Sequence, residues 1–297
     1  MVSNSKRWPV IETASLLAVA FVLIPATVLH ADDGFPEFGW DRVPLYAHLG
    51  IGEGLQPEQY QFLADRFKLI AFTGGILRNA PVEPNIAAAA KAIKSRNPKA
   101  KVIFYWASDM PKHQWQLSNA TFPEGGYLRA KKGGRDSLQF DVRRQDVRDW
   151  WSDIAGKAVH DYGCDGIFVD GLTAGSPRGV WNRMFGAEQA AEMDKGVFAM
   201  LKQSREKMGP GKLILFNPLH GYDETHPGLG EQYLPATDGA MVDDFDRGAS
   251  VRRQSPEYMA NTIEAMRKAA KDGKIVIFKG WPQFTWRTDS DIMKKPH

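Results

Sequence analysis

Short apolar runs alternate along this chain with stretches whose apolar residues recur at helical spacing. Seven apolar runs are visible, at residues 43–50, 68–72, 101–106, 166–170, 212–217, 239–245 and 274–279. Helical spacing predicts helices over residues 57–67, 85–97, 146–162, 189–208 and 256–271. Asn85 and Ser255 are expected to cap two of these helices. Continuous apolar strands that alternate with helices are typical of a parallel sheet whose faces are covered by helices.

Two α/β architectures satisfy this alternation, a closed (β/α)₈ TIM-type barrel and an open doubly wound sheet. No GxGxxG or GxxxxGK[ST] motif follows a predicted strand, which removes support for the nucleotide-binding open sheets. A length of 297 residues also suits one barrel domain. We therefore predict the barrel. Because an eighth strand is not visible, we expect either a strand from the region of Trp40 or a barrel that is incomplete at its C-terminus.

The N-terminus has the pattern of a secretory signal. Lys6 and Arg7 precede an apolar run from Ala14 to Leu29, and polar sequence begins after Ala31. The run is shorter than the roughly 20 residues that span a bilayer, so an uncleaved membrane anchor is the less favoured alternative. We expect a signal over residues 1–31, a single catalytic barrel over 32–297, and a secreted or periplasmic protein without stable membrane insertion after cleavage.

Charge and cysteine content narrow the class of protein further. Lys and Arg number 38 against 35 for Asp and Glu, a net charge of +3, which is too balanced to indicate nucleic-acid binding by bulk charge. Cys164 is the only cysteine, so the chain as given forms no internal disulfide or CxxC centre. Because Cys164 precedes an apolar strand, we predict a buried side chain rather than a nucleophile. No cofactor is expected.

In a barrel, the residues that end the strands form the active site, because the C-terminal strand ends meet at one rim. The residues at the predicted strand ends are His48, Thr73, Tyr105 or Trp106, Asp170, Asn217, Asp243 with Asp244, and Lys279 to Trp281. Asp170 and Asp243 each follow a strongly apolar run, and a charge at such a crowded place is costly unless it has a role.

Two carboxylates on different strands of one rim suit the cleavage of a glycosidic bond. One carboxylate attacks or stabilises the anomeric centre, and the other gives a proton to the departing oxygen. The alternative is that Asp170 and Asp243 cap loops or pair with Arg178, Arg247 or Arg252. Strand spacing by itself leaves both interpretations open.

A short segment carries a resemblance to known enzymes. Residues 140–151, Phe-Asp-Val-Arg-Arg-Gln-Asp-Val-Arg-Asp-Trp-Trp, are followed by Asp-Gly-Ile-Phe-Val-Asp at 165–170. Together they resemble the D…P-x-[AV]-R-x-W-W…[FC]-D-G-[IV]-[FY]-x-D segment of retaining TIM-barrel glycosidases, with Gln145 in place of the proline. The chain is similar to the α-galactosidase and α-glucosidase superfamily, and more closely to glycoside-hydrolase-like families near endo-α-1,4-polygalactosaminidase.

This resemblance implies a retaining glycoside hydrolase and assigns roles to the two carboxylates. Asp170 would be the nucleophile, and Asp243 would be the proton donor, held protonated by a less polar setting. Asp243 ends the sequence Asp-Gly-Ala-Met-Val-Asp at 238–243, which resembles the D-G-x-x-x-E/D pattern of these groups. Asp244 remains an alternative for the acid, because the relatives more often carry Glu at the position of Asp243.

Aromatic and polar side chains near the predicted rim suit a carbohydrate ligand, since flat rings stack on sugar faces while polar groups bind hydroxyls. The expected substrate-binding residues are His48, Tyr105, Trp106, Asn217, Asp244 and Trp281, with Trp115 and Trp286 as further aromatics on loops. Trp150 and Trp151 lie within a predicted helix and are expected in the core. The long connection over residues 108–139 is expected to be a functional loop.

Two other functions satisfy part of the pattern. A secreted carbohydrate-binding barrel without turnover would keep the aromatic residues and would not need two acids. A metal-dependent hydrolase could use His48, His220, Asp170 and Asp243 as ligands, but the chain contains no HExxH motif or cysteine ligand pair. An exported barrel of unrelated chemistry also remains open.

Overall fold

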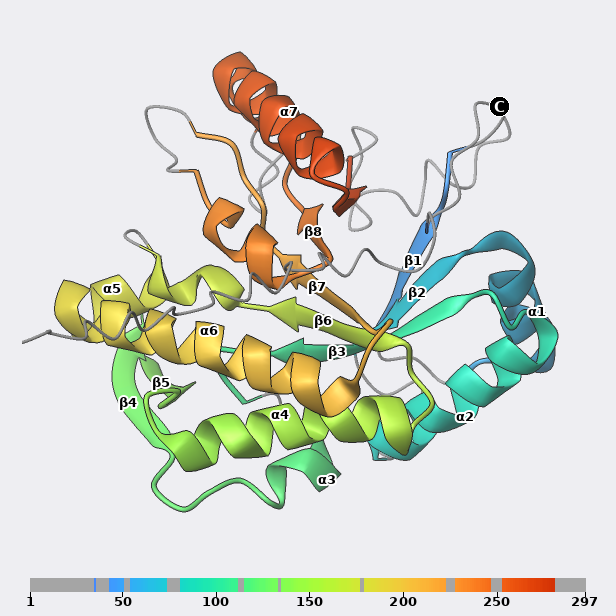
Figure 1. Cartoon of the computed structure of the whole chain (residues 1–297), viewed down its shortest axis with the longest axis horizontal. Helices are drawn as coiled ribbons and strands as arrows, with labels where there is room; N and C mark the ends of the chain where they lie inside the picture. The colour runs from blue at the N-terminus through green and yellow to red at the C-terminus, as the bar shows by residue number, and fades with distance from the viewer. Residues whose placement is uncertain are drawn as a thin grey trace, which may run out of the picture.

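Seven parallel strands form one sheet in the order β1-β2-β3-β6-β7-β8-β9 (Figure 1). The computed structural model describes residues 35, 43–50, 54–73, 81–111, 115–132, 135–176, 179–222, 228–246 and 253–280. The strands are β1 (Tyr46–Leu49), β2 (Leu69–Phe72), β3 (Lys101–Ala107), β6 (Gly166–Asp170), β7 (Leu213–Asn217), β8 (Gly239–Val242) and β9 (Ile275–Phe278). All seven predicted strands are confirmed, and the sheet curls into a nearly closed barrel of the TIM type.

The strands β1 and β9 are the two edges of this sheet. Within the described ranges no strand pairs with the outer side of either one. Trp40, which was considered as the source of an eighth strand, lies outside the described residues. The same is true of the predicted signal over residues 1–31, and no helix in the described part is long and apolar enough to cross a bilayer.

Helices follow the strands and cover the sheet. They are α1 (Pro57–Arg66), α2 (Val82–Arg96), α4 (Gln145–His160), α6 (Ala187–Met208) and α7 (Pro256–Lys271). Ser255 caps α7 as predicted, because its side chain accepts a hydrogen bond of 3.0 Å from the Tyr258 amide. The cap predicted at Asn85 is wrong. The helix α2 begins at Val82, and Asn85 Nδ2 instead donates to the Pro81 carbonyl at 2.7 Å.

The core lies between the sheet and these helices. Every residue of β2 and of β8 is buried, as expected for strands covered on both faces. Helices α4 and α6 run side by side along the sheet (Figure 1). Trp150 and Trp151 of α4 are core residues as predicted, and the Trp151 indole donates to the Ala107 carbonyl at 2.8 Å. Cys164 is also buried as predicted, and burial raises the pKa of its thiol to about 12.

The connection between β3 and α4 is not the loop that was expected. It contains a short helix α3 (Gln116–Asn119) and an antiparallel hairpin of β4 (Tyr127–Lys132) and β5 (Arg135–Phe140). The hairpin lies on the side of the sheet toward which the arrowheads of β3 and β6 point (Figure 1). A sequence signal for it existed, because Gly133-Gly134 separates two six-residue runs and is a typical two-residue hairpin connection.

Three shorter elements were also not predicted. They are the 3₁₀ helices η2 (Leu172–Gly175) and η3 (Glu231–Ala236) and the helix α5 (Val180–Phe185). The helix η2 begins directly after Gly171, which has a φ of +77°. Glycine adopts this backbone conformation at little cost, so the chain can turn immediately after Asp170.

An Asp-Gly pair starts β6 and joins it to both neighbouring strands. The Asp165 carboxylate accepts the Val102 amide of β3 at 2.9 Å and the Lys94 ammonium at 2.8 Å. A Cβ atom on Gly166 would lie 2.0 Å from the Leu213 carbonyl oxygen of β7. The aspartate therefore secures the strand on one side, and the glycine permits close approach of backbone on the other.

The same arrangement starts β8. The Asp238 carboxylate accepts the Ile214 amide of β7 at 2.7 Å and Arg205 NH2 at 2.6 Å. A Cβ atom on Gly239 would lie 2.3 Å from the Ile275 carbonyl oxygen of β9. In both strands four residues separate this aspartate from a second one, in the sequences Asp-Gly-Ile-Phe-Val-Asp and Asp-Gly-Ala-Met-Val-Asp. The two second aspartates, Asp170 and Asp243, are thus carried to the same end of the barrel.

We predict that Gly166→Ala lowers the free energy of unfolding by about 3 kcal/mol or more, because the added methyl group collides with backbone that cannot rotate away. Urea unfolding followed by circular dichroism measures the change. Gly50→Ala is the control, because a Cβ atom there meets no atom within 4 Å, and we expect it to change stability by less than about 0.5 kcal/mol. Equal losses in the two variants would contradict the prediction.

Candidate active site

Asp170 ends β6, and three donors hold its carboxylate. The Tyr105 hydroxyl donates to Oδ2, while Asn217 Nδ2 and the Gly171 amide donate to Oδ1 at 3.3 and 3.0 Å. The parallel register places these groups together, because Asp170 pairs with Ala107 of β3 and with Asn217 of β7. Hydrogen bonds from three directions fix the orientation of the carboxylate.

Tyr105 is buried, whereas a residue that stacks on a sugar is expected to be exposed. Only 5% of it is exposed, and its ring stacks on Phe168 with centroids 6.2 Å apart. Burial and the adjacent Asp170 carboxylate raise the pKa of the Tyr105 hydroxyl. The hydroxyl therefore stays protonated as a donor to Asp170, and the side chain positions that carboxylate.

Trp106 was predicted to bind substrate, and this prediction is wrong. Successive residues of a strand face opposite sides, so Trp106 points away from Tyr105 and packs under α4. It is 2% exposed, and its indole donates to the Trp151 carbonyl at 3.2 Å. Trp115 is likewise fully buried, against Phe104 at a ring-centroid distance of 4.5 Å. The predicted aromatics Trp281 and Trp286 lie outside the described residues.

Asp243 follows β8, and Lys279 follows the neighbouring strand β9. The Lys279 ammonium contacts Oδ1 of Asp243, and the Lys279 amide donates to the Val242 carbonyl at 2.9 Å. The side chain of Asp243 is 35% exposed. This setting differs from the less polar one expected for a protonated acid, because a cation contacts the carboxylate. Asp244, the alternative acid, is half-buried, and its carbonyl accepts from Gln254 Nε2 at 3.1 Å.

Asn217 presents an acceptor at the site. A carboxylate can only accept hydrogen bonds, so the amide nitrogen of Asn217 must face Asp170. Its Oδ1 atom then faces away from Asp170, is buried, and has no hydrogen-bond partner among the described residues. A buried carbonyl oxygen without a partner is costly, so this atom is suited to receive a donor from a ligand.

His48 stands at the end of β1 and is exposed. Its ring lies 5.2 Å from that of Phe168 and 6.1 Å from that of Tyr105, measured between centroids. The pKa of His48 is lowered by desolvation among these groups. The Asp170 and Asp243 carboxylates oppose this shift, and Lys279 adds to it. His48 is therefore close enough to the carboxylates of both β6 and β8 to respond to their charge.

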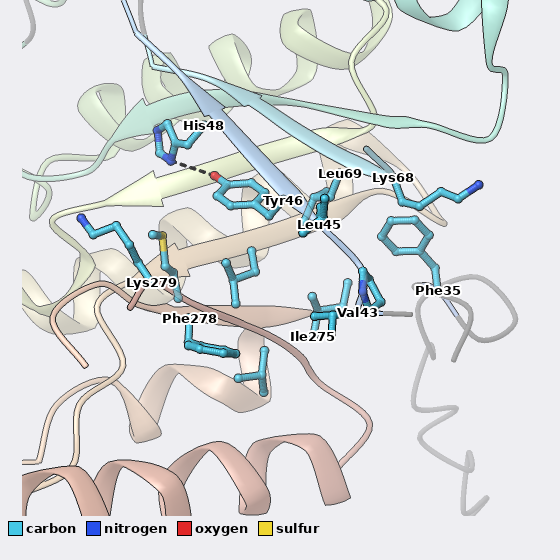
Figure 2. A pocket seen from close by; sticks show the side chains of 14 residues that line it. Phe35, Val43, Leu45, Tyr46, His48, Lys68, Leu69, Ile275, Phe278 and Lys279 are labelled. Atoms are coloured by element: carbon cyan, nitrogen blue, oxygen red, sulfur yellow. Dashed lines mark hydrogen bonds between the residues drawn. The ribbon is translucent and has the colours of Figure 1, made fainter. Parts of the chain in front are cut away.

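A cavity of about 480 Å³ lies between the two edge strands and reaches the site (Figure 2). Its polar end is formed by Tyr46, His48 and Lys279, and its remaining lining includes Val43, Leu45, Leu69, Ile275 and Phe278. Figure 2 shows the Tyr46 hydroxyl directed at the His48 ring, with Lys279 nearby on the opposite edge. The polar residues of β1 and β9 therefore belong to both the cavity and the rim.

A metal centre built from the four residues considered above does not form in the described part of the chain. His220 lies beyond β7 with its ring 5.9 Å from that of Tyr258 on α7. No group of three or more His, Cys, Asp or Glu side chains there is placed to hold an ion. Of the predicted site residues, the fold gathers His48, Tyr105, Asp170, Asn217 and Asp243 at one end of the barrel.

Comparison with known proteins identifies the kind of enzyme. A profile of the hypothetical glycosyl hydrolase family 15 matches residues 94–295, about two thirds of the chain. The chain belongs to this family. It is therefore a glycoside hydrolase, and its substrate is a carbohydrate. Comparison with curated proteins gave no match.

The chain is similar to solved structures of carbohydrate-active proteins. The glycoside hydrolase domain of PelA from Pseudomonas aeruginosa is 14% identical, with a TM-score of 0.55 over 78% of this chain and 81% of that chain. The structure of Ega3 from Aspergillus fumigatus in complex with galactosamine is 12% identical, with a TM-score of 0.49 over 81% of this chain and 78% of that chain. The likeness to PelA confirms the barrel architecture.

We predict that the pKa of His48 lies below 6.5, its ordinary value, and responds to both neighbouring charges. Asp170→Asn removes an anion and should lower the pKa further, whereas Lys279→Met removes a cation and should raise it. A histidine-ring NMR titration measures these shifts. Lys68→Met is the matched control, because Lys68 lines the opposite end of the same cavity (Figure 2). A pKa of His48 that is the same in all four proteins would contradict the proposed grouping of charges.

Proposed function

We propose that this protein is a retaining glycoside hydrolase in which Asp170 is the nucleophile. The observation that carries this proposal is the set of three donors, from Tyr105, Asn217 and Gly171, that hold the Asp170 carboxylate at the rim. A nucleophile must be correctly aimed before the substrate arrives, and these contacts fix its orientation. Attack on the anomeric carbon forms a covalent glycosyl-enzyme and expels the leaving sugar.

Asp243 serves as the acid and base in this proposal. It directly follows β8, whereas Asp170 is the last residue of β6, and it contacts Lys279 at the same end of the barrel. In the first step a protonated Asp243 gives its proton to the departing oxygen, and in the second step its carboxylate accepts a proton from the attacking water. The contact with Lys279 must be released in the first step, because it occupies Oδ1 of the carboxylate.

Two further residues are proposed to bind the sugar. Asn217 Oδ1 is a buried acceptor without a partner in the described structure, so it is suited to a sugar hydroxyl or amide donor. His48 is an exposed ring at the same end of the barrel. Donor and acceptor groups on opposite sides of Asp170 would orient the anomeric carbon toward the nucleophile, which is how positioned hydrogen bonds contribute to catalysis.

We also propose that the protein is exported, so that its substrate is a poly- or oligosaccharide outside the cytoplasm. The support is the pattern of Lys6, Arg7 and the apolar run from Ala14 to Leu29. Expression of the full chain followed by N-terminal sequencing of the exported protein tests this point. A protein that keeps Met1 and stays inside the cell would contradict it.

We predict that Asp170→Asn and Asp243→Asn each lower kcat/KM by at least about 10³-fold, because each removes a group that acts only in the chemical steps. A digestion screen over a panel of polysaccharides identifies a cleaved substrate, on which the variants are then compared. Asp161→Asn, at the exposed C-terminal cap of α4, is the matched control. If a variant turns over normally, the residue that it replaces has no role in the mechanism. If the wild type binds a sugar and cleaves none, the protein is a carbohydrate-binding protein.

The stereochemistry of the product tests the role of Asp170 directly. We expect the first product to keep the anomeric configuration of the substrate, because two displacements at one carbon restore it. NMR of the fresh hydrolysate measures this configuration. With Asp170→Gly, added azide should restore part of the activity and give a glycosyl azide of inverted configuration. Inversion by the wild-type enzyme would contradict a nucleophilic Asp170.

A further inference from the structure

The hydroxyl of Tyr46 contacts a single polar group. It lies 2.8 Å from Nδ1 of His48, two residues along β1 (Figure 2). In the described part of the chain the hydroxyl has no other hydrogen-bond partner. Tyr46 is half-buried at the polar end of the cavity between β1 and β9. A buried phenol generally finds a partner for its proton, and here that partner is the His48 ring.

The direction of this hydrogen bond follows from the two groups. Burial, together with the Asp243 charge, raises the pKa of Tyr46, so its hydroxyl keeps its proton. With one partner available, the hydroxyl donates that proton to Nδ1 of His48. A ring nitrogen that accepts a hydrogen bond carries no proton of its own. Because desolvation lowers the pKa of His48, the ring is neutral near pH 7, and its one N–H is at Nε2.

The reverse arrangement is less favourable. If Nδ1–H donated to the Tyr46 oxygen, the phenol proton would have no acceptor in the described structure. In that case an unprotonated Nε2 would also face the rim. The rim contains the carboxylates of Asp170 and Asp243, and both favour positive charge on His48. Two other ionisable groups face the ring. Lys279 is only a donor, and the Tyr105 hydroxyl donates to Asp170 and makes no hydrogen bond with Tyr46 in the described structure.

Nε2 of His48 has no protein partner in the described ranges, and the ring is exposed at the site end of β1. We propose that Tyr46 is a positioning residue that holds His48 as a neutral Nε2–H donor to an oxygen of the sugar bound beside Asp170. This inference rests on the proposed function. In this arrangement the sugar accepts a hydrogen bond from His48 and donates one to Asn217 Oδ1.

Histidine-ring ¹⁵N–¹H NMR tests the tautomer without any substrate. The wild type should show the pattern of a ring protonated at Nε2, and Tyr46→Phe should show a mixture that includes the Nδ1-protonated form. Tyr60→Phe, another half-buried tyrosine, on α1, is the matched control and should leave the His48 signals unchanged. A wild-type ring protonated at Nδ1, or a tautomer that Tyr46→Phe does not change, overturns the proposal.

Kinetics on a cleaved polysaccharide test the consequence for binding. Tyr46→Phe should raise KM about 5-fold with little change in kcat, which is the loss expected for one weakened hydrogen bond. His48→Gln should retain more activity than His48→Asn, because a glutamine amide nitrogen reaches the place of Nε2 and an asparagine nitrogen that of Nδ1. Equal activity of these two variants overturns the proposal. If the wild type cleaves no glycan, the proposed function fails, and the NMR result still decides the tautomer.

Discussion

The Asp-Gly pairs that start β6 and β8 are the constraint on which the rest of the barrel depends. In each pair the aspartate binds the amide of the preceding strand and a basic side chain, Lys94 or Arg205, while the glycine lets the following strand approach. Register in a parallel sheet is set where each strand begins, and a shift of one residue would turn every side chain to the opposite face. The pairs at the bottom of the barrel therefore determine which residues reach the rim.

With this register, the carboxylates of Asp170 and Asp243 both lie at the rim, and their surroundings differ. Asp170 is held by neutral donors from β3, β7 and its own backbone, whereas Asp243 is held by the cation of Lys279. Enzymes that use two carboxylates in different roles commonly separate the roles by environment. In the proposed mechanism, neutral donors aim the nucleophile Asp170, and the ion pair of Asp243 with Lys279 is released when the acid acts.

Much of this was predictable from the sequence, and the failures have physical reasons. The seven strands, the barrel and the strand-end position of Asp170 follow from apolar runs that end in polar residues. The sequence does not show which of Tyr105 and Trp106 faces the barrel interior. A strand that is buried on both faces has no alternation of apolar and polar residues. The contact of Lys279 with Asp243 depends on how two neighbouring strand ends are rotated. The hairpin of β4 and β5 did carry a signal at Gly133-Gly134, which the basic and polar composition of the segment obscured.

The edge position of β1 has a mechanical consequence. This strand is hydrogen-bonded to β2 on one side, and no strand pairs with its other side in the described structure. Asp170, in contrast, lies on β6, which is paired on both sides by β3 and β7. Of these two strands, the one paired on both sides carries the proposed nucleophile, and the one paired on a single side carries His48. If the proposed function holds, we expect His48 to shift more readily than Asp170 when sugars of different size bind.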